Sequence, residues 1–179
     1  MIVKISNIAK VLLIGGLMMV AQLVAPLANA QEATNLGTFK FWTAWKGTDA
    51  DGVVCYISSQ PQDAQPTNVN RDPIHFLVVH RKGRGTWNEA QTLVGYPLKE
   101  GSTPSVVVDG KSYSMIIEGS AAFLASIDDD APFVDAMKRG SELVVKGLSQ
   151  RGTNTTDTYS LGGVTLAMKE IDKACGYSP

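Results

Sequence analysis

The sequence predicts a mainly β domain that also contains a short internal helix and a C-terminal helix. Three observations support this fold class. Segments rich in β-branched and aromatic residues recur between residues 39 and 117, separated by clusters of Gly, Pro, Asp and Asn. Acidic and cationic ends mark a helix near residues 131–139. Apolar residues at spacings of three and four mark a second helix at the C-terminus.

The β-type segments predict eight strands. They are Phe39–Lys46, Val53–Ser59, Ile74–His80, Trp87–Tyr96, Ser105–Val108, Ser112–Ile117, Glu142–Ser149 and Thr156–Leu161. Asp109-Gly110 is the clearest turn, because glycine supplies the positive φ that a tight hairpin requires. A turn at residues 151–154 joins the last two strands into a second hairpin. Residues 60–73, with three prolines and two asparagines, are expected to form a loop.

The internal helix has recognisable ends. Three aspartates at residues 128–130 place negative charge where the helix dipole favours it, and Pro132 suits a first turn. Lys138 and Arg139 place positive charge in the last turn, and Gly140 provides a stop. A calcium loop is the alternative for the aspartates, but such loops space their ligands at alternate positions and place Gly at the turn. Helix capping explains the aspartates more simply.

The C-terminal helix carries one apolar stripe, formed by Val164, Ala167, Met168, Ile171, Ala174 and Cys175. This stripe turns Cys175 towards the core. In the strand Val53–Ser59, the two-residue alternation allows Cys55 to face the core as well.

The N-terminus has the three-part pattern of a cleavable signal peptide. Two lysines accompany an apolar run at residues 11–24, and the triplet Ala28-Asn29-Ala30 follows. We predict cleavage after Ala30, with residues 1–30 as signal peptide and residues 31–179 as a single domain. A transmembrane anchor is the alternative, but it needs about 20 apolar residues, and this run is shorter. No transmembrane span is expected in the mature chain.

The chain has only two cysteines, Cys55 and Cys175. Because disulfides persist in oxidising compartments outside the cytoplasm, export leads us to expect one disulfide between them. The sequence has no C-x-x-C redox motif and no Cys/His cluster at zinc-ligand spacing.

The chain holds 16 Lys and Arg against 17 Asp and Glu, and removal of residues 1–30 takes away two lysines and no acid. This acidic balance argues against nucleic acid as a partner.

Candidate catalytic groups are few. His75 and His80 lie five residues apart in a predicted strand, so they project from opposite faces. Pairing of both cysteines leaves no thiol nucleophile. We therefore expect no catalytic residues, no metal site and no cofactor. A hydrolase acting on an envelope polymer is the minor alternative, and its candidate groups are His75, His80, Asp157 and Glu89.

The segment Arg151–Leu161 combines hydroxyl side chains with one arginine and one aspartate. One interpretation is a polar recognition loop with candidate binding residues Arg151, Thr153, Asp157 and Tyr159. The favoured interpretation is a turn in which Arg151 pairs with Asp157 and the hydroxyls bond to the backbone.

The three tryptophans offer a second candidate surface. Trp42, Trp45 and Trp87 would form an aromatic face for carbohydrate or for a partner protein. The alternative is packing in the core, which is the better account of at least one of them, because tryptophan is usually largely buried.

Motifs along the whole mature chain occur in a specific order and spacing. They are Trp45, Val54–Ser59, Asn88-Glu89, Gly95-Tyr96-Pro97, Ala136–Ser141, Val144–Gly147, Ser149-x-Arg151-Gly152-Thr153 and Thr156–Leu161. Together they resemble the invasion-associated locus B family of exported bacterial proteins. The resemblance implies an immunoglobulin-like β-sandwich in which Cys55 and Cys175 fill the family's strand and tail cysteine positions. It supplies no catalytic motif.

These features lead to one leading functional hypothesis. The chain is expected to be an exported, non-enzymatic protein of the periplasm, the outer membrane or the cell exterior, with a role in host-cell invasion or adhesion. It would act by binding a protein partner on the host surface or in the bacterial envelope. The alternative is a general structural or stress-related envelope protein with no host role.

Overall fold

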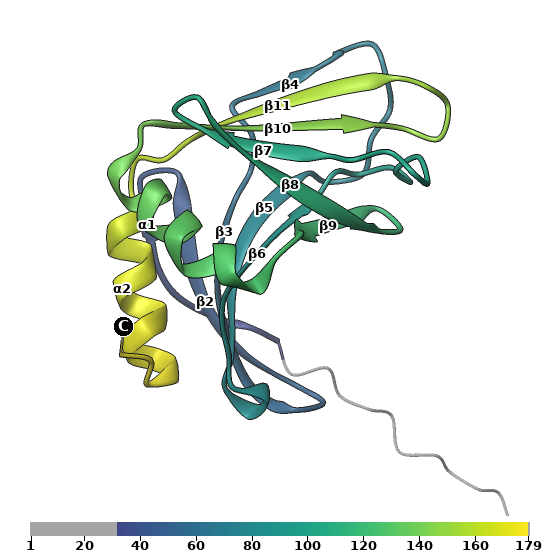
Figure 1. The fold of residues 1–179 in the computed structure, drawn as a ribbon. Coiled ribbons are helices and arrows are strands. Elements are labelled where there is room, and N and C mark those ends of the chain that lie inside the picture. Colours follow the sequence, from purple (N-terminus) through teal and green to yellow (C-terminus); the bar gives the residue numbers. More distant parts are fainter. Residues whose placement is uncertain (1–31, 179) are drawn as a thin grey trace, which may run out of the picture. The chain divides into compact units, whose positions relative to one another are not determined.

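The computed structural model describes residues 32–178, so the predicted signal peptide and its cleavage site lie outside the described residues. Eleven strands and two α-helices occur in the described part (Figure 1). The strands are β1 (Thr34–Phe39), β2 (Trp42–Asp49), β3 (Gly52–Ser59), β4 (Asp63–Gln65), β5 (His75–Arg81), β6 (Thr86–Leu93), β7 (Ser105–Val108), β8 (Lys111–Glu118), β9 (Ala121–Leu124), β10 (Glu142–Leu148) and β11 (Asn154–Ser160). The helices are α1 (Asp130–Arg139) and α2 (Val164–Cys175).

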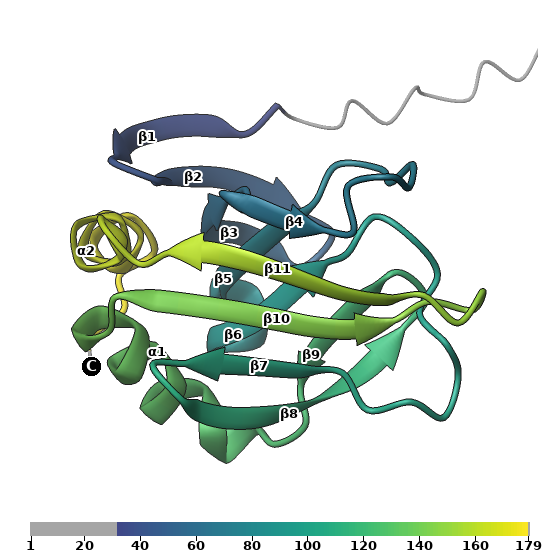
Figure 2. The ribbon, with the colours of Figure 1, turned by 90° about the horizontal axis from the view of Figure 1, so that it is seen from above.

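The strands form one antiparallel sheet in the order β1-β2-β3-β5-β6-β9-β8-β7-β10-β11-β4. The sheet changes layer along β8, whose first half pairs with β7 and whose second half pairs with β9. Figure 2 shows the β7, β10, β11 and β4 part crossing over the β5, β6 and β9 part. The predicted mainly β sandwich with an internal and a C-terminal helix is therefore confirmed, and its two layers belong to one continuous sheet.

The core lies between these layers, where strand alternation turns apolar side chains inwards. Phe76 of β5 packs against Tyr159 of β11 with ring centroids 5.9 Å apart, and against Phe133 of α1 at 6.0 Å. All three side chains have no exposed surface. Aromatic contacts therefore connect the two layers and α1.

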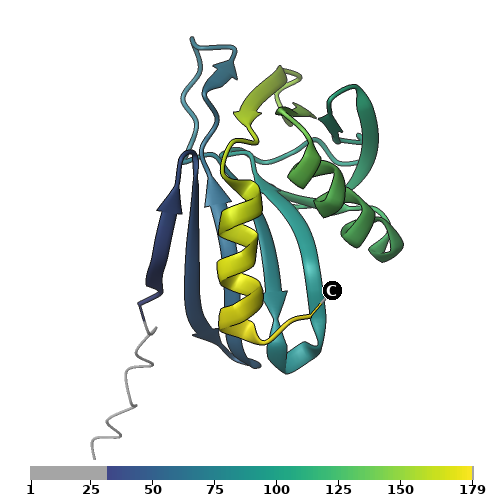
Figure 3. The same cartoon turned by 90° about the vertical axis from the view of Figure 1, so that its left-hand side faces the viewer.

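Helix α2 covers the inner face of β1, β2 and β3 (Figure 3). Its apolar stripe follows the predicted pattern, since Val164, Ala167, Met168, Ile171 and Cys175 are all buried. The helix ends at Gly176, whose φ of 72° is the left-handed conformation that suits glycine at a C-terminus.

The ends of α1 differ in detail from the sequence prediction. A 3₁₀ turn at Ile127–Asp129 precedes the helix, and the Ser126 hydroxyl accepts a hydrogen bond from the Asp128 amide. Gly140 follows the last turn in extended conformation, with φ of −84°. Glycine is needed there for space, because a Cβ would lie 2.8 Å from a Leu161 methyl and 2.9 Å from a Val108 methyl.

Three strands were absent from the sequence prediction, namely β1, β4 and β9. The predicted strand at residues 39–46 was wrong at its start, because Lys40 adopts a φ of 54° and turns the chain between β1 and β2. The predicted loop at residues 60–73 contains β4, a polar three-residue strand that forms by pairing with the edge of β11. Such a strand depends on its partner rather than on local propensity.

Candidate functional site

A polar hollow of about 610 Å³ is the candidate binding site. Three segments surround it. They are residues 68–72 from the loop after β4, residues 95–97 from the turn after β6, and the β10–β11 hairpin, which contributes Ser149, Gln150, Arg151 and Thr153 from its turn and Thr155 from β11. Its volume falls in the range typical of ligand sites.

Arg71 lines the polar hollow and forms a buried ion pair with Asp157, and we call this pair the floor of the hollow. The Arg71 guanidinium donates to both carboxylate oxygens of Asp157, at 2.6 and 2.5 Å. It also donates from Nε and from a terminal nitrogen to the Val94 carbonyl, at 3.0 and 2.8 Å. The two side chains are only 6% and 0% exposed. This bidentate geometry is the strong form of an arginine–carboxylate contact.

Asp157 therefore pairs with Arg71, and the predicted pairing with Arg151 is wrong. Alternation along β11 directs Asp157 into the protein, whereas Arg151 lies exposed in the turn before the strand. The loop after β4 reaches over to supply the buried cation instead.

Backbone contacts hold the walls of the polar hollow together. The Asp72 amide donates to the Gly95 carbonyl at 2.9 Å, and the Gln150 amide donates to the Pro97 carbonyl at 3.1 Å. Gly95 has a φ of 75°, and a Cβ at this position would lie 2.2 Å from the Asp72 carbonyl oxygen. Only glycine permits this close approach of the two segments. The polar hollow is thus formed before any ligand binds.

Tyr96 connects the turn after β6 to the β10–β11 hairpin. Its hydroxyl lies 2.5 Å from the Thr155 hydroxyl, and the Arg71 guanidinium lies 5.0 Å from the centre of its ring. Gly147 of β10 makes room for this tyrosine, since a Cβ there would lie 2.7 Å from the Tyr96 hydroxyl. Burial is the main cause that raises the pKa of Tyr96, so the phenol remains protonated at physiological pH.

The four candidate residues of the predicted recognition loop divide into two groups. Arg151 and Thr153 line the polar hollow. Asp157 and Tyr159 are fully buried and therefore serve the floor and the core. Sequence reasoning missed the contribution of the loop at residues 68–72. An arginine flanked by asparagine and aspartate in a proline-rich loop was the available signal.

The tryptophans do not form one aromatic face. Trp42 lies in the core and its indole donates to the Ser160 carbonyl at 2.9 Å. Trp45 stacks against Tyr56 on the opposite face of the sheet, whereas Trp87 packs against Tyr177. Packing in the core, the preferred account of at least one tryptophan, is confirmed for Trp42.

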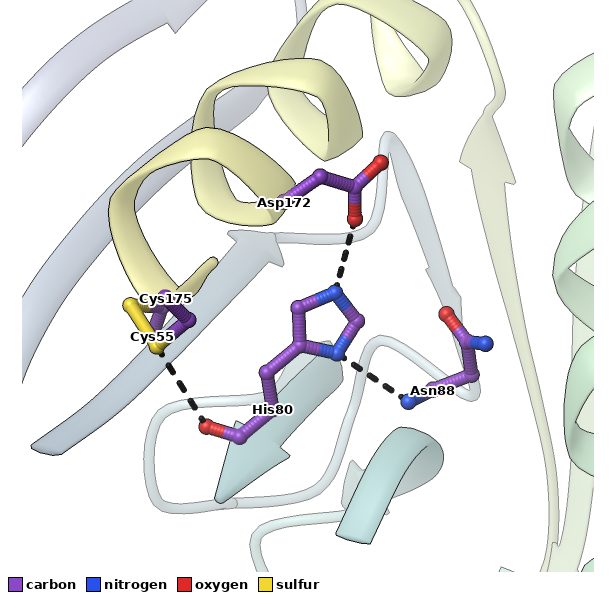
Figure 4. The surroundings of a disulfide bond; sticks show 5 residues. All are labelled: Cys55, His80, Asn88, Asp172 and Cys175. Carbon is purple, nitrogen blue, oxygen red and sulfur yellow. Dashed lines mark hydrogen bonds and ion pairs between the residues drawn. A yellow bond between two sulfur atoms is a disulfide. The ribbon is translucent and has the colours of Figure 1, made fainter. Parts of the chain in front are cut away.

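A second polar centre lies beside the disulfide (Figure 4). Cys55 of β3 and Cys175 of α2 form the predicted bond, and both are fully buried. His80 accepts a hydrogen bond at Nδ1 from the Asn88 amide at 3.1 Å, which places the ring proton on Nε2 facing Asp172 at 2.8 Å. The His80 carbonyl also lies 4.0 Å from the Cys175 sulfur. This centre therefore attaches α2 to β5 and β6.

The groups considered for a hydrolase do not meet at one place. Both ring nitrogens of His80 are occupied within the fold, and Asp157 is held by Arg71. Glu89 lies 3.4 Å from Arg81, and burial lowers the pKa of His75.

Among residues 32–178, no three His, Cys, Asp or Glu side chains are grouped to hold a metal ion. No helix in this part of the chain has the length and hydropathy to cross a membrane.

Asp130 makes stability depend on pH. Burial raises the pKa of this carboxyl to about 6, a hydrogen bond from the Ala90 backbone opposes the rise, and the nearby Glu89 and Asp129 add to it. Because the folded chain favours the protonated acid, ionisation costs stability as the pH rises from about 4 to above 6. Asp130→Asn should remove this cost and raise the free energy of unfolding by up to about 3 kcal/mol at pH 7.5, with little gain at pH 4.

Urea denaturation at the two pH values measures this gain. Asp135→Asn, at an exposed position of α1 that is not among the groups acting on Asp130, is the matched control and should change stability by less than about 0.5 kcal/mol. An equal gain from Asp130→Asn at both pH values would contradict the assignment.

The sequence of this chain matches a known protein family, and its fold matches a known structure. The family model for "Invasion associated locus B (IalB) protein" matches residues 42–172. A crystal structure of invasion associated protein B from Bartonella henselae aligns with a TM-score of 0.56 and 15% sequence identity, covering 79% of this chain and 97% of that chain. At 15% sequence identity, this similarity is evidence of a shared fold only. No curated protein matches the chain in sequence.

Proposed function

The chain belongs to the invasion associated locus B family, and we propose that it is an exported, non-enzymatic binding module that contributes to host-cell invasion or adhesion. The family match carries this proposal. The binding surface would be the polar hollow, and the partner would be a protein component of the host surface or of the bacterial envelope.

Two features of the chain support an extracytoplasmic location. The signal-peptide pattern at residues 1–30 predicts export and release of residues 31–179 as one domain. The buried Cys55–Cys175 bond fits an oxidising compartment, where disulfides persist. N-terminal sequencing of the exported protein should find Gln31 as its first residue. Recovery of Met1 would contradict cleavage.

The arrangement of polar side chains supports binding rather than catalysis. A catalytic site needs a nucleophile or base positioned towards substrate. His80, the buried histidine, is committed to Asn88 and Asp172, and the cysteines are paired. The polar hollow instead presents amide and hydroxyl groups on a frame held by backbone hydrogen bonds, and such polar groups can orient a bound partner.

Deletion of the gene in the source bacterium tests the proposal. We expect fewer bacteria inside cultured host cells, restoration by the wild-type chain, and unchanged survival in detergent. Crosslinking in the wild-type strain should capture a surface component that the deletion strain does not yield. A detergent-sensitive strain with normal invasion would instead favour the general envelope role.

A further inference from the structure

We propose that the polar hollow binds a short segment of a neutral glycan. This inference rests on the proposed binding function and specifies the chemistry of its ligand. The glycan has two sources. It is either a chain carried on a surface protein, which is the partner class proposed above, or a polymer of the bacterial envelope, which would take the place of that protein as the partner. The side chains of the polar hollow recognise the chemistry that these sources share.

The lining consists largely of groups that both donate and accept hydrogen bonds. Asn68, Asn70 and Gln150 are exposed and contribute side-chain amides, and Thr153 contributes a hydroxyl. Each sugar hydroxyl also donates and accepts, so amides and hydroxyls can satisfy both of its roles. A ligand that only accepts, such as a phosphate, would leave the amide oxygens without donors.

The charge of the polar hollow also favours a neutral ligand. Arg71 is neutralised by Asp157 in the floor. The remaining charged side chains in the lining are Arg151 and Asp72, which have opposite signs, and both residues are exposed. Polyanions are bound by several cations on one surface, and this lining does not provide them. A guanidinium and a carboxylate at one site instead suit a ligand with many donors and acceptors.

The lining contributes apolar surface as well, which excludes a site for ions alone. Val69, Tyr96 and Pro97 all line the polar hollow, and Val69 is 38% exposed. Sugar rings carry apolar C–H groups beside their hydroxyls, and these groups gain from contact with valine and aromatic side chains.

The rigidity of the site supports binding without rearrangement. The Asp72–Gly95 and Gln150–Pro97 backbone bonds connect the three walls, and Arg71 fixes the loop from below. A preformed site avoids much of the entropy cost of ordering loops on binding. Gly95-Tyr96-Pro97 and Ser149-x-Arg151-Gly152-Thr153, two of the motifs that resemble the family, provide two of these walls.

Nuclear magnetic resonance titration of the exported, disulfide-bonded protein tests the proposal. The probes are chitotetraose and maltotetraose, two neutral oligosaccharides with and without N-acetyl groups. We expect saturable shifts in the side-chain amides of Asn68, Asn70 and Gln150 with at least one probe. Arg151→Ala and Asn70→Ala should each weaken binding about tenfold or more, because a polar group of the bound sugar then loses its hydrogen-bond partner in the complex.

Arg139→Ala is the matched control, because Arg139 is an exposed arginine in the last turn of α1 and does not line the polar hollow. Its affinity should equal that of the wild type, and all variants should keep the wild-type melting temperature. Absence of saturation with both probes, shifts that Arg151→Ala leaves unchanged, or tighter binding of heparin or a glycan-free peptide would overturn the proposal.

Two further arms identify the source and separate this inference from the proposed function. Capture by purified envelope polymer supports the bacterial source, and capture by host glycoproteins that disappears after enzymatic removal of their glycans supports the host source. A deletion strain whose invasion is restored fully by the Arg151→Ala chain would overturn glycan recognition and leave the invasion role standing.

Discussion

Asp157→Asn should lower the free energy of unfolding by about 3–5 kcal/mol, because it leaves the Arg71 charge buried without a counterion. The arginine side chain is only 6% exposed, so water can replace the lost carboxylate only in part. The Val94 carbonyl would remain its acceptor but carries no full charge. Urea denaturation of the oxidised protein at pH 7 measures the loss.

An exposed ion pair provides the matched control. Arg84 and Asp51 form a similar side-chain contact at the other end of the sheet, with side chains 58% and 40% exposed. Asp51→Asn should therefore cost less than about 1 kcal/mol. The pair of results separates the effect of burial from the effect of removing one carboxylate. Equal losses from the two substitutions would contradict the explanation by desolvation.

A double substitution tests the cause more directly. Replacing both Arg71 and Asp157 by apolar residues of similar volume removes the buried charges together, and such replacements are often neutral or stabilising. We expect Arg71→Met with Asp157→Leu to recover most of the stability that Asp157→Asn loses. The same variant should lose oligosaccharide binding, because Arg71 fixes the loop that carries Asn68 and Asn70. Failure to recover stability would show that the pair supplies more than charge balance.

The parts of the fold that the sequence predicted are those with a strong local pattern. The stripe ending at Cys175 and the alternation around Cys55 directed both sulfurs inwards, and the structure joins them. The turn at Asp109-Gly110 was equally clear, and both residues have positive φ. Period and turn chemistry are properties of a few neighbouring residues, so one sequence suffices to recognise them.

The missed elements depend on partners far away in the chain. The polar strand β4 forms because β11 offers an unpaired edge, and its own residues, Asp63–Gln65, have little β propensity. The ion pair in the floor joins residues 86 positions apart. The sequence identified Asp157 and Arg151 as polar candidates, but it contained no information on which arginine the fold would bring to the carboxylate.

The two ends of the sheet are stabilised by different means. At the polar hollow, the Arg71–Asp157 pair attaches a loop to β11. At the other end, the disulfide and the His80–Asp172 contact attach α2 to β3 and β5. The first attachment maintains a binding surface, whereas the second closes the core beneath the C-terminal helix. Damage to one end should therefore leave the local structure of the other end largely intact.

The disulfide tests this separation, and its removal should have the other large effect. Cys55 and Cys175 are 120 residues apart, and a loop of this length corresponds to a stabilisation of about 5 kcal/mol from the entropy of the unfolded chain. We expect Cys55→Ala with Cys175→Ala to lose about 3–5 kcal/mol in urea denaturation. Reduced wild-type protein, prepared by unfolding in reductant, should show a similar loss.

Hydrogen exchange shows where the fold opens after this substitution. Amides of α2 should exchange faster in the double-alanine variant, because a terminal segment opens readily once its tether is lost. Adding Asp172→Asn should accelerate this exchange further, since His80 then loses its carboxylate partner on the helix. Amides around Gly95 and Gln150 should keep most of their protection. Uniform loss of protection in both regions would show that the sheet unfolds as one cooperative unit and that the two ends are not independent.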